Sequence, residues 1–484
     1  MKRNIILKIS IPFLLMGSLV SVFTSCEDYL DVRPKSQIPI DIHFESESGF
    51  KDQLIGVYTK MTQSTMYGRE MTFGLTEVLA QNYDLDSESE YWYTSKYQYT
   101  EISTKRRIDS IWSNTYNAIA NLNVILDNID KVDRDIFTEN HYELYKGETL
   151  GLRAYLHFDM LRIFAPSYAS NQNAPAIPYV TEYAIKIVPR STVSVALDSI
   201  ISDLTKSTIL LESDSLKSSP SQYVHRGRRK YFNYYAAEMT LARAYLYKGD
   251  KVNALKHAQI IIDEAEAGKS SPAFSWVHYT AIETTYEYQC DRTYSTEQIF
   301  QLNINKMDDI VSDYFTSKAL KNTLSPSDNK ADIIYEKTSK GYGNDYRMDK
   351  NFKYDGTRTD RYLSKFWQYE NSPYNKIFPL IRLTEAYYIA AEALKDSNPE
   401  KAIELLNTVR SHRKLEDYPL STTLTADEIQ NEIYKEYRKE FLGEGQLFYY
   451  YKRLNLPVID GAGVIANDNI YVLPLPDNEI EFGQ

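Results

Sequence analysis

The stretch "NYDLDSESEYWYTSKYQY", from Asn82 to Tyr99, joins acidic side chains to a tryptophan and several tyrosines. A pyranose ring has a face of C–H bonds that stacks on an aromatic ring, and its hydroxyl groups need donors and acceptors around the rim. The stretch supplies both kinds of group, so it is a candidate carbohydrate site. The alternative is that its aromatic rings only pack the loop against a core. The candidate ligand-binding residues here are Asp84, Asp86, Trp92, Tyr93 and Tyr97.

The alternating acids Asp84, Asp86 and Glu88 resemble the start of a calcium-binding loop. An EF-hand also needs a glycine at its sixth position and a bidentate glutamate at its twelfth, where this chain has Ser89 and Ser95. An EF-hand is therefore excluded. A weaker calcium site of another kind stays open, and no metal ligand is assigned.

The sequence carries no catalytic signature. It has no phosphate-binding glycine loop, nucleophile elbow or zinc motif, and its 7 histidines show no metal-ligand spacing. "GAGVIA", from Gly461, imitates a dinucleotide fingerprint, but too little chain follows it for a βαβ unit. A glycosidase needs two carboxylates across the scissile bond, and among 66 acidic residues such pairs are inevitable and therefore uninformative. We expect a binding protein that needs no cofactor rather than an enzyme.

The N-terminus has the layout of an export signal, with basic residues ahead of an apolar run from Ile9 to Phe23. We expect residues 1–25 to be removed, although a buried N-terminal helix would look similar. "FTSC", ending at Cys26, resembles a bacterial lipobox, so Cys26 is the predicted lipid anchor. Cys290 is the only other cysteine and is left without a disulfide partner. The formal net charge of −11 argues against a nucleic-acid partner.

Helical signals dominate the rest of the chain. Asn398 and Pro399 occupy the N-cap and first helical positions ahead of an apolar stripe. Thr425 and Glu428 have capping-box spacing, and Gly443 stands where a left-handed cap is expected. These signals predict a mostly α-helical fold.

An internal echo indicates degenerate repeats: "RAYL" occurs at 153–156 and at 243–246, and "EAYY" at 385–388. Small residues let neighbouring helices approach closely, as in stacked helical hairpins of the tetratricopeptide kind. In "LYKGDKVNAL" one helix is predicted to end at Gly249 and the next to begin at Asp250. The repeats are unequally spaced, which requires large insertions between them.

Several sequence blocks follow one another along the chain: "CEDYLDVRPKS", "IWSNTYNAIANLNVIL", "KGETLGLRAYLHFDMLRIFAP", "RKYFNYYAAEMTLARAYLYKGD", "IRLTEAYYIAAEAL", "IYKEYRKEFLGEGQLFYYYKRLN" and "YVLPLPDNEIEFG". In this order they resemble the SusD/RagB family of outer-membrane nutrient-binding lipoproteins. The resemblance implies about four tetratricopeptide-like helix pairs and a long irregular, loop-rich insertion that carries much of the ligand surface. It implies a signal peptide at 1–25, a helical-repeat region at 26–271, the aromatic-rich insertion at 272–375 and a C-terminal helical region at 376–484.

The resemblance also implies a function. Members of the family cover a TonB-dependent, SusC-like transporter in the outer membrane, capture oligosaccharides or in some cases peptides, and are not catalysts. Glu27 and Asp28 resemble the signal that sends such lipoproteins to the outer face of the outer membrane. Three alternatives stay open: a peptide-binding member of the family, a helical-repeat scaffold for protein partners, and a glycoside hydrolase. By position, the insertion residues that would share one glycan site with the 82–99 loop are Trp276, Tyr279, Tyr286 and Tyr288.

Other charged residues in these blocks are interpreted as scaffold. Tyr155, Asp159 and Arg162 stand at i, i+4 and i+7, where they can satisfy one another inside a buried helix. The same structural interpretation applies to Arg438, Glu440 and Arg453.

Overall fold

The computed structural model of the protein describes residues 39–483, apart from 220 and 357–359. The predicted signal peptide and Cys26 lie outside the described residues. The short helix α2 (Ile40–His43) belongs to a separate N-terminal unit, Met1–Glu45, and all other described elements belong to the unit Ser46–Gln484. No helix among the described residues is both long and apolar enough to cross a bilayer.

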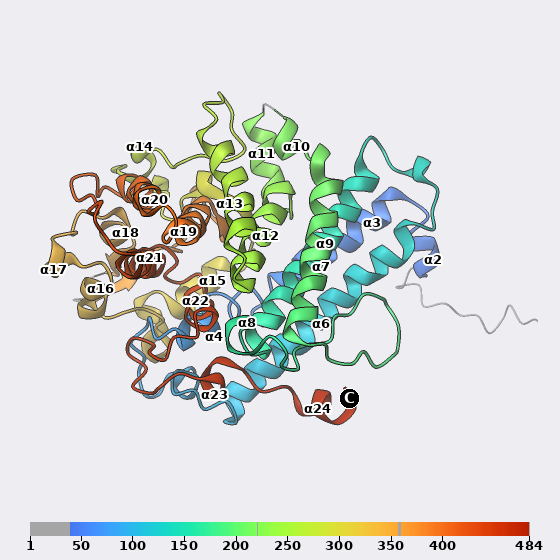
Figure 1. The fold of residues 1–484 in the computed structure, drawn as a ribbon, viewed down its shortest axis with the longest axis horizontal. Coiled ribbons are helices and arrows are strands. Elements are labelled where there is room, and N and C mark those ends of the chain that lie inside the picture. The colour runs from blue at the N-terminus through green and yellow to red at the C-terminus, as the bar shows by residue number, and fades with distance from the viewer. Residues whose placement is uncertain (1–38, 220, 357–359, 484) are drawn as a thin grey trace, which may run out of the picture. The chain divides into compact units, whose positions relative to one another are not determined.

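Stacked helices form the scaffold, and Figure 1 shows them following one another in chain order. They pack as four pairs, α3 with α6, α7 with α9, α12 with α13 and α19 with α20, and neighbouring pairs also pack on each other. This arrangement confirms the predicted fold of helix pairs. The scaffold helices are α3 (Glu47–Met61), α6 (Ile102–Ile129), α7 (His141–Phe164), α9 (Val193–Leu210), α12 (Tyr234–Lys248), α13 (Lys251–Glu266), α19 (Leu383–Leu394), α20 (Pro399–Ser411), α21 (Ala426–Glu440) and α22 (Leu447–Arg453).

The predicted helix boundaries are confirmed at several places. Asn398 caps α20 with its side chain, and Thr425 and Glu428 form a complete capping box at the start of α21. Gly249 ends α12 in the left-handed region with φ of 82°, a conformation that costs glycine nothing, and Asp250 caps α13. These helix boundaries were therefore predicted correctly from neighbouring residues in the sequence.

Helix α7 is buried along nearly its whole length, because it lies between α6 and α9 and carries apolar residues on every face. Gly151 permits the close approach on one side. A Cβ atom at this position would lie 2.3 Å from Cε1 of Phe232 and 2.6 Å from Oγ of Ser207. Any larger residue would have to push these groups apart.

The region between α13 and α19 is irregular but ordered. Two short antiparallel strands, β1 (Gln298–Asn303) and β4 (Ile377–Arg382), pair within it and bring the two ends of residues 304–376 together. Strand β4 leads directly into α19. A smaller antiparallel pair, β2 (Phe352–Tyr354) and β3 (Arg361–Leu363), lies within it. Its short helices are α14 (Tyr279–Ile282), α15 (Met307–Tyr314), α16 (Asp328–Ile334), α17 (Lys337–Lys340) and α18 (Tyr346–Asp349), with 3₁₀ turns at Glu287–Gln289, Ser295–Glu297 and Ser317–Asn322.

Further short helices connect the scaffold elements. They are α4 (Leu75–Leu79), α5 (Trp92–Ser95), α8 (Tyr168–Asn171), α10 (Ser215–Ser218), α11 (Gln222–Arg228), α23 (Asp468–Tyr471) and α24 (Asp477–Phe482), with 3₁₀ turns at Arg134–Ile136 and Leu211–Ser213.

We predict that the mature protein folds without a disulfide and that its melting temperature is insensitive to reductant. Cys290 is a buried free thiol whose Sγ contacts the carbonyl oxygen of Ile282 at 3.4 Å, and burial raises its pKa. Cys290→Ser should therefore remain soluble and unfold cooperatively. Thermal melts of both proteins with and without dithiothreitol check this, and a reductant-dependent loss of structure in the unmodified protein would contradict it.

Candidate functional site

The loop Asn82–Tyr99, here called the Trp92 loop, is fastened to the scaffold by Tyr91. The Tyr91 side chain is buried, its hydroxyl donates to Oε2 of Glu70 at 3.0 Å, and the Arg107 guanidinium lies 4.1 Å from its ring centroid. Burial raises the pKa of Glu70, although the neighbouring Arg69 and Arg107 oppose this shift. With Tyr91 turned inward, the next residues of the loop reach the surface.

The aromatic candidates of the Trp92 loop differ in exposure. Tyr93 is 45% exposed, and Trp92 is half-buried with the Lys96 ammonium 4.4 Å from its ring centroid. Tyr97 is 9% exposed, and its hydroxyl donates to the carbonyl oxygen of Leu79 at 3.0 Å. Trp92 and Tyr93 are therefore available to a ligand, while Tyr97 supports the loop from inside.

The Trp92 loop lies against residues 314–330 of the irregular region. The Tyr314 hydroxyl donates to Oε1 of Glu90 at 2.8 Å, and the Glu90 amide donates to Oδ1 of Asn322 at 3.1 Å. Between these contacts, Leu320 holds a left-handed φ of 51° while its side chain is 71% exposed. A non-glycine residue in such a conformation is strained, and strained residues cluster at binding sites. We call the exposed parts of Trp92 and Tyr93 the Trp92 surface; Leu320 lies two residues from Asn322, which contacts Glu90 of the same loop.

The acids of the Trp92 loop bind other protein groups. Oδ1 of Asp84 lies 2.7 Å from the Lys330 ammonium, and its other oxygen accepts from the Ser327 amide. Burial raises the pKa of Asp84, but these hydrogen bonds outweigh it and lower the pKa overall. Asp86 accepts from the Glu88 amide at 2.8 Å. Within the described part of the chain, no three His, Cys, Asp or Glu side chains converge as a metal site.

The insertion candidates Trp276 and Tyr279 line a separate groove of about 570 Å³, here called the Trp276 groove. The Trp276 ring stacks on His412 with 4.1 Å between centroids and 11° between planes, and Tyr279 is 56% exposed. Burial, and then the charge of Arg413, lower the pKa of His412 to about 4, so the imidazole is neutral at pH 7. The lining residues are Trp276, Val277, His278, Tyr279, Glu283, Tyr346, Ser411, His412, Lys414 and Glu416.

The structure therefore does not bring the sequence-predicted site residues together in one place. In Figure 1, α14, which begins at Tyr279, lies beside α20, whereas α4, which precedes the Trp92 loop, lies lower in the view, on the other side of α19 and α21. Tyr286 and Tyr288 are exposed, with ring centroids 5.8 Å apart, but they are not among the lining residues of the groove. The insertion does face the Trp92 loop, but through residues 314–330.

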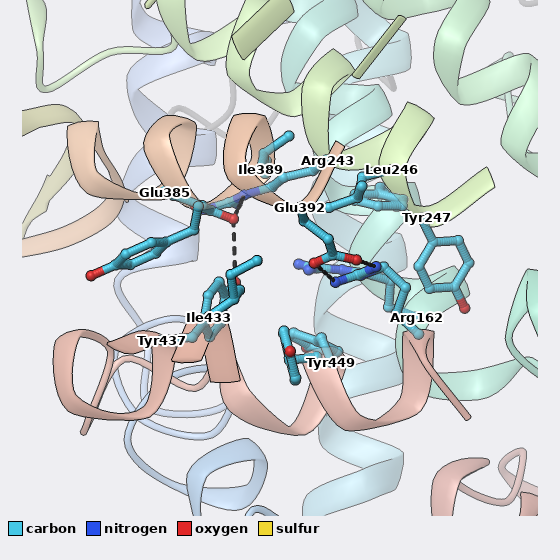
Figure 2. Close-up of a pocket in the computed structure, with 14 residues that line it drawn as sticks. Arg162, Arg243, Leu246, Tyr247, Glu385, Ile389, Glu392, Ile433, Tyr437 and Tyr449 are labelled. Atoms are coloured by element: carbon cyan, nitrogen blue, oxygen red, sulfur yellow. Dashed lines mark hydrogen bonds and ion pairs between the residues drawn. The ribbon is translucent and has the colours of Figure 1, made fainter. Parts of the chain in front are cut away.

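A further hollow lies inside the scaffold and is lined by paired charges and aromatic rings. Figure 2 shows this cavity of about 40 Å³ between α7, α12, α19, α21 and α22. Nε of Arg243 donates to Oε1 of Glu385 at 2.7 Å, and Nη1 of Arg453 donates to Oε1 of Glu392 at 2.6 Å. The cavity is too small for a sugar ring, and its charges are already paired. It belongs to the scaffold.

The predicted scaffold charges are buried and paired. Arg162 donates to Asp159, whose other oxygen accepts from the Tyr67 hydroxyl at 2.6 Å, so Tyr67 takes the place expected for Tyr155 beside the carboxylate. Nη1 of Arg438 lies 3.0 Å from Oδ2 of Asp460. Arg453 pairs with Glu392, and Glu440 joins a larger network of buried arginines.

Sequence reasoning missed two residues that hold the Trp276 groove. Oε1 of Glu297 accepts from the Val277 amide at 3.2 Å and from Nη1 of Arg413 at 3.0 Å, so it ties both walls together. Neither Glu297 nor Arg413 lies in a sequence motif, and because they are far apart in the chain, no local pattern predicts that they pair. Tyr346 was also missed, and its hydroxyl donates to Oε1 of Glu283 at 3.0 Å.

Two family models match consecutive parts of the chain. A SusD-like model described as "Starch-binding associating with outer membrane" matches residues 28–246, and the SusD family model that includes RagB matches residues 273–471. The SusD-like protein P25 of Formosa agariphila is 24% identical over 200 residues, which are 39% of this chain and 36% of that protein. The match thus spans little more than a third of that relative's length.

Solved structures share the fold. A SusD-like carbohydrate-binding protein from Bacteroides vulgatus superposes with a TM-score of 0.70 at 18% identity, over 90% of this chain and 96% of that one. A SusD superfamily protein from Bacteroides thetaiotaomicron gives 0.68 at 20% identity, over 90% and 98%. A laminarin-binding SusD-like protein gives 0.65 at 20% identity, over 90% and 98%. At these identities the likeness shows the fold alone.

Proposed function

Because the chain belongs to the SusD/RagB family, we propose that it is a lipid-anchored surface protein that binds oligosaccharides and delivers them to a TonB-dependent transporter in the outer membrane. Cys26 is the anchor and the protein faces the cell exterior. It binds its ligand without converting it chemically, and it passes the unchanged ligand to the transporter.

The single observation that carries the ligand class is the composition of the Trp92 surface. Tyr93 is 45% exposed beside the half-buried Trp92, and Asn322 of the irregular region binds the Glu90 amide of the same loop. Stacking aromatics on a rigid scaffold bind sugars through their C–H faces, while loops supply hydrogen-bonding groups at the rim. Carboxylates in the Trp92 loop are held in salt bridges and amide contacts, which suits binding better than general acid–base chemistry.

We predict that Trp92→Ala weakens glycan binding about tenfold or more, because a lost stacking contact removes roughly 1 to 2 kcal/mol of binding free energy. Trp92 is half-buried, so the loss of folding stability should stay below the roughly 3 to 5 kcal/mol typical of a core aromatic. A glycan array of the mature protein identifies the ligand, and calorimetric titration beside a thermal melt then compares the variants.

The matched control is Tyr183→Ala, which removes a 60%-exposed tyrosine from a different loop and should leave the affinity unchanged. Tyr97→Phe, which removes only the hydroxyl bound to Leu79, should likewise keep the affinity. Full glycan binding by a well-folded Trp92→Ala variant would remove Trp92 from the site. Selective binding of peptides and of no glycan would favour the peptide-binding alternative.

A further inference from the structure

We infer that the Trp276 groove is a second saccharide-binding site, separate from the Trp92 surface, and that it takes uncharged sugar rings. The inference rests on the proposed function only for the class of ligand. Its volume, its aromatic walls and its charges support the groove as a binding site independently of that function. Its volume of about 570 Å³ falls within the range of roughly 300 to 1,000 Å³ that is usual for small-molecule sites.

The groove has one fixed aromatic wall and one open aromatic platform. Trp276 is held by its stack on His412 and by Tyr387, whose ring centroid lies 5.0 Å away. Tyr279, on α14, is 56% exposed beside that wall, and the His278 ring lies 4.5 Å from its ring centroid. A pyranose ring that stacks on Tyr279 would place its edge against Trp276. Hydroxyl-bearing edges would then meet the polar rim.

The rim is acidic and has no free cation. The Lys414 ammonium pairs with Glu283, and hydrogen bonds from Lys414 and then Tyr346 lower the pKa of that carboxyl, so it stays ionised at neutral pH. Among the described residues Glu416 forms no ion pair, and His412 is neutral at pH 7. A uronate or sulfate group would face the carboxylates of Glu283 and Glu416, while Lys414, the one cation among the lining residues, is already paired, so repulsion outweighs attraction. Neutral hydroxyls instead find carboxylate acceptors.

The groove is also preorganised, which lowers the entropic cost of binding. Glu297 joins the Val277 amide, on the wall of the groove, to Arg413, next to His412. The Tyr294 ring lies beneath the Arg413 guanidinium, 4.0 Å from centroid to Cζ. These buried contacts hold the Trp276 and His412 rings parallel before any ligand arrives.

Fluorine NMR of the mature protein labelled with 5-fluorotryptophan tests the inference, because the chain has only 4 tryptophans. Trp92 reports the Trp92 surface, Trp276 reports the groove, and Trp112, which is 7% exposed on α6 and lines another groove, reports binding elsewhere. Each resonance is assigned from a Trp→Phe variant. The probes are neutral maltohexaose, laminarihexaose and cellohexaose, and oligogalacturonate as the anionic counterpart.

We expect at least one neutral hexasaccharide to shift the Trp276 resonance saturably, with oligogalacturonate about tenfold weaker or worse. Tyr279→Ala should abolish this shift and preserve the shift of Trp92, while Trp92→Ala should preserve the shift of Trp276. Glu416→Gln should reduce the difference in affinity between neutral and anionic sugars, since it removes the unpaired carboxylate and keeps the shape of the rim.

The outcomes separate the two proposals. A shift of Trp92 with none at Trp276 overturns the second site and leaves the proposed function standing. A shift at Trp276 alone supports the groove and removes Trp92 from the primary site. Movement of neither resonance with any neutral probe counts against both proposals, and tighter binding of oligogalacturonate at Trp276 overturns the charge argument.

Discussion

Replacing Glu440 with alanine is expected to lower the free energy of unfolding by about 3 to 5 kcal/mol. The Glu440 side chain is fully buried, and its oxygens accept from Arg382, from Nη2 of Arg413 at 2.8 Å and from Nη1 of Arg347 at 3.2 Å. Burial alone would raise the pKa of Glu440, but the charges of Arg413 and Arg382 hold it well below its usual value. Without this carboxylate, the buried guanidinium groups of Arg347, Arg382 and Arg413 lose a shared counter-charge and repel one another.

Urea unfolding followed by circular dichroism measures this effect. Glu440→Gln keeps the shape of the side chain and removes only its charge, so it should destabilise nearly as much as alanine does. Glu428→Ala, on the same helix α21 but in an exposed capping box, is the matched control and should cost far less. Equal losses for the buried and the exposed glutamate would show that the network contributes little.

Replacing Cys26 with alanine is expected to abolish lipid labelling and to remove the protein from the outer-membrane fraction. Several acyl chains on one cysteine, at roughly 0.8 kcal/mol for each buried CH₂ group, give stable anchoring. The thiol is the only group in "FTSC" that can carry the diacylglycerol. The variant therefore loses the whole anchoring energy rather than a fraction of it.

Incorporation of labelled palmitate, followed by membrane fractionation, measures the loss. Cys290→Ser is the matched control, because it removes the other cysteine of the chain and should label normally. Protease added to intact cells should digest the unmodified protein if it faces the exterior. Undiminished palmitate labelling of Cys26→Ala would refute the anchor assignment.

Features encoded by neighbouring residues could be predicted from the sequence. The caps at Asn398 and Thr425, and the left-handed Gly249, are confirmed because each depends on a few consecutive side chains and backbone angles. Helical hairpins followed from periodicity and from the repeated segments, and the four pairs followed from the resemblance to the SusD/RagB family. The exposure of Tyr93 was consistent with the loop composition, whereas nothing in the sequence distinguished it from the buried Tyr97.

Features that depend on distant pairing could not be predicted. The echo between "RAYL" at 243–246 and "EAYY" at 385–388 was visible, yet the finding that Arg243 of one pairs with Glu385 of the other needed the fold. Likewise, the resemblance to the SusD/RagB family implied one site for Trp276 and Trp92. Their separation follows from the anchoring of Trp276 to His412 on the C-terminal side.

The β1–β4 strand pair fixes both ends of a long segment of the irregular region. Because Asn303 pairs with Ile377 in the ladder, residues 304–376 begin and end at the same point of the sheet. For a loop with anchored ends, doubling its length costs only about 0.6 kcal/mol of closure entropy. Lengthening an exposed turn of this segment is therefore cheap in closure entropy, whereas exchange of the whole segment would also remove buried contacts with α21, such as that of Arg347 with Glu440.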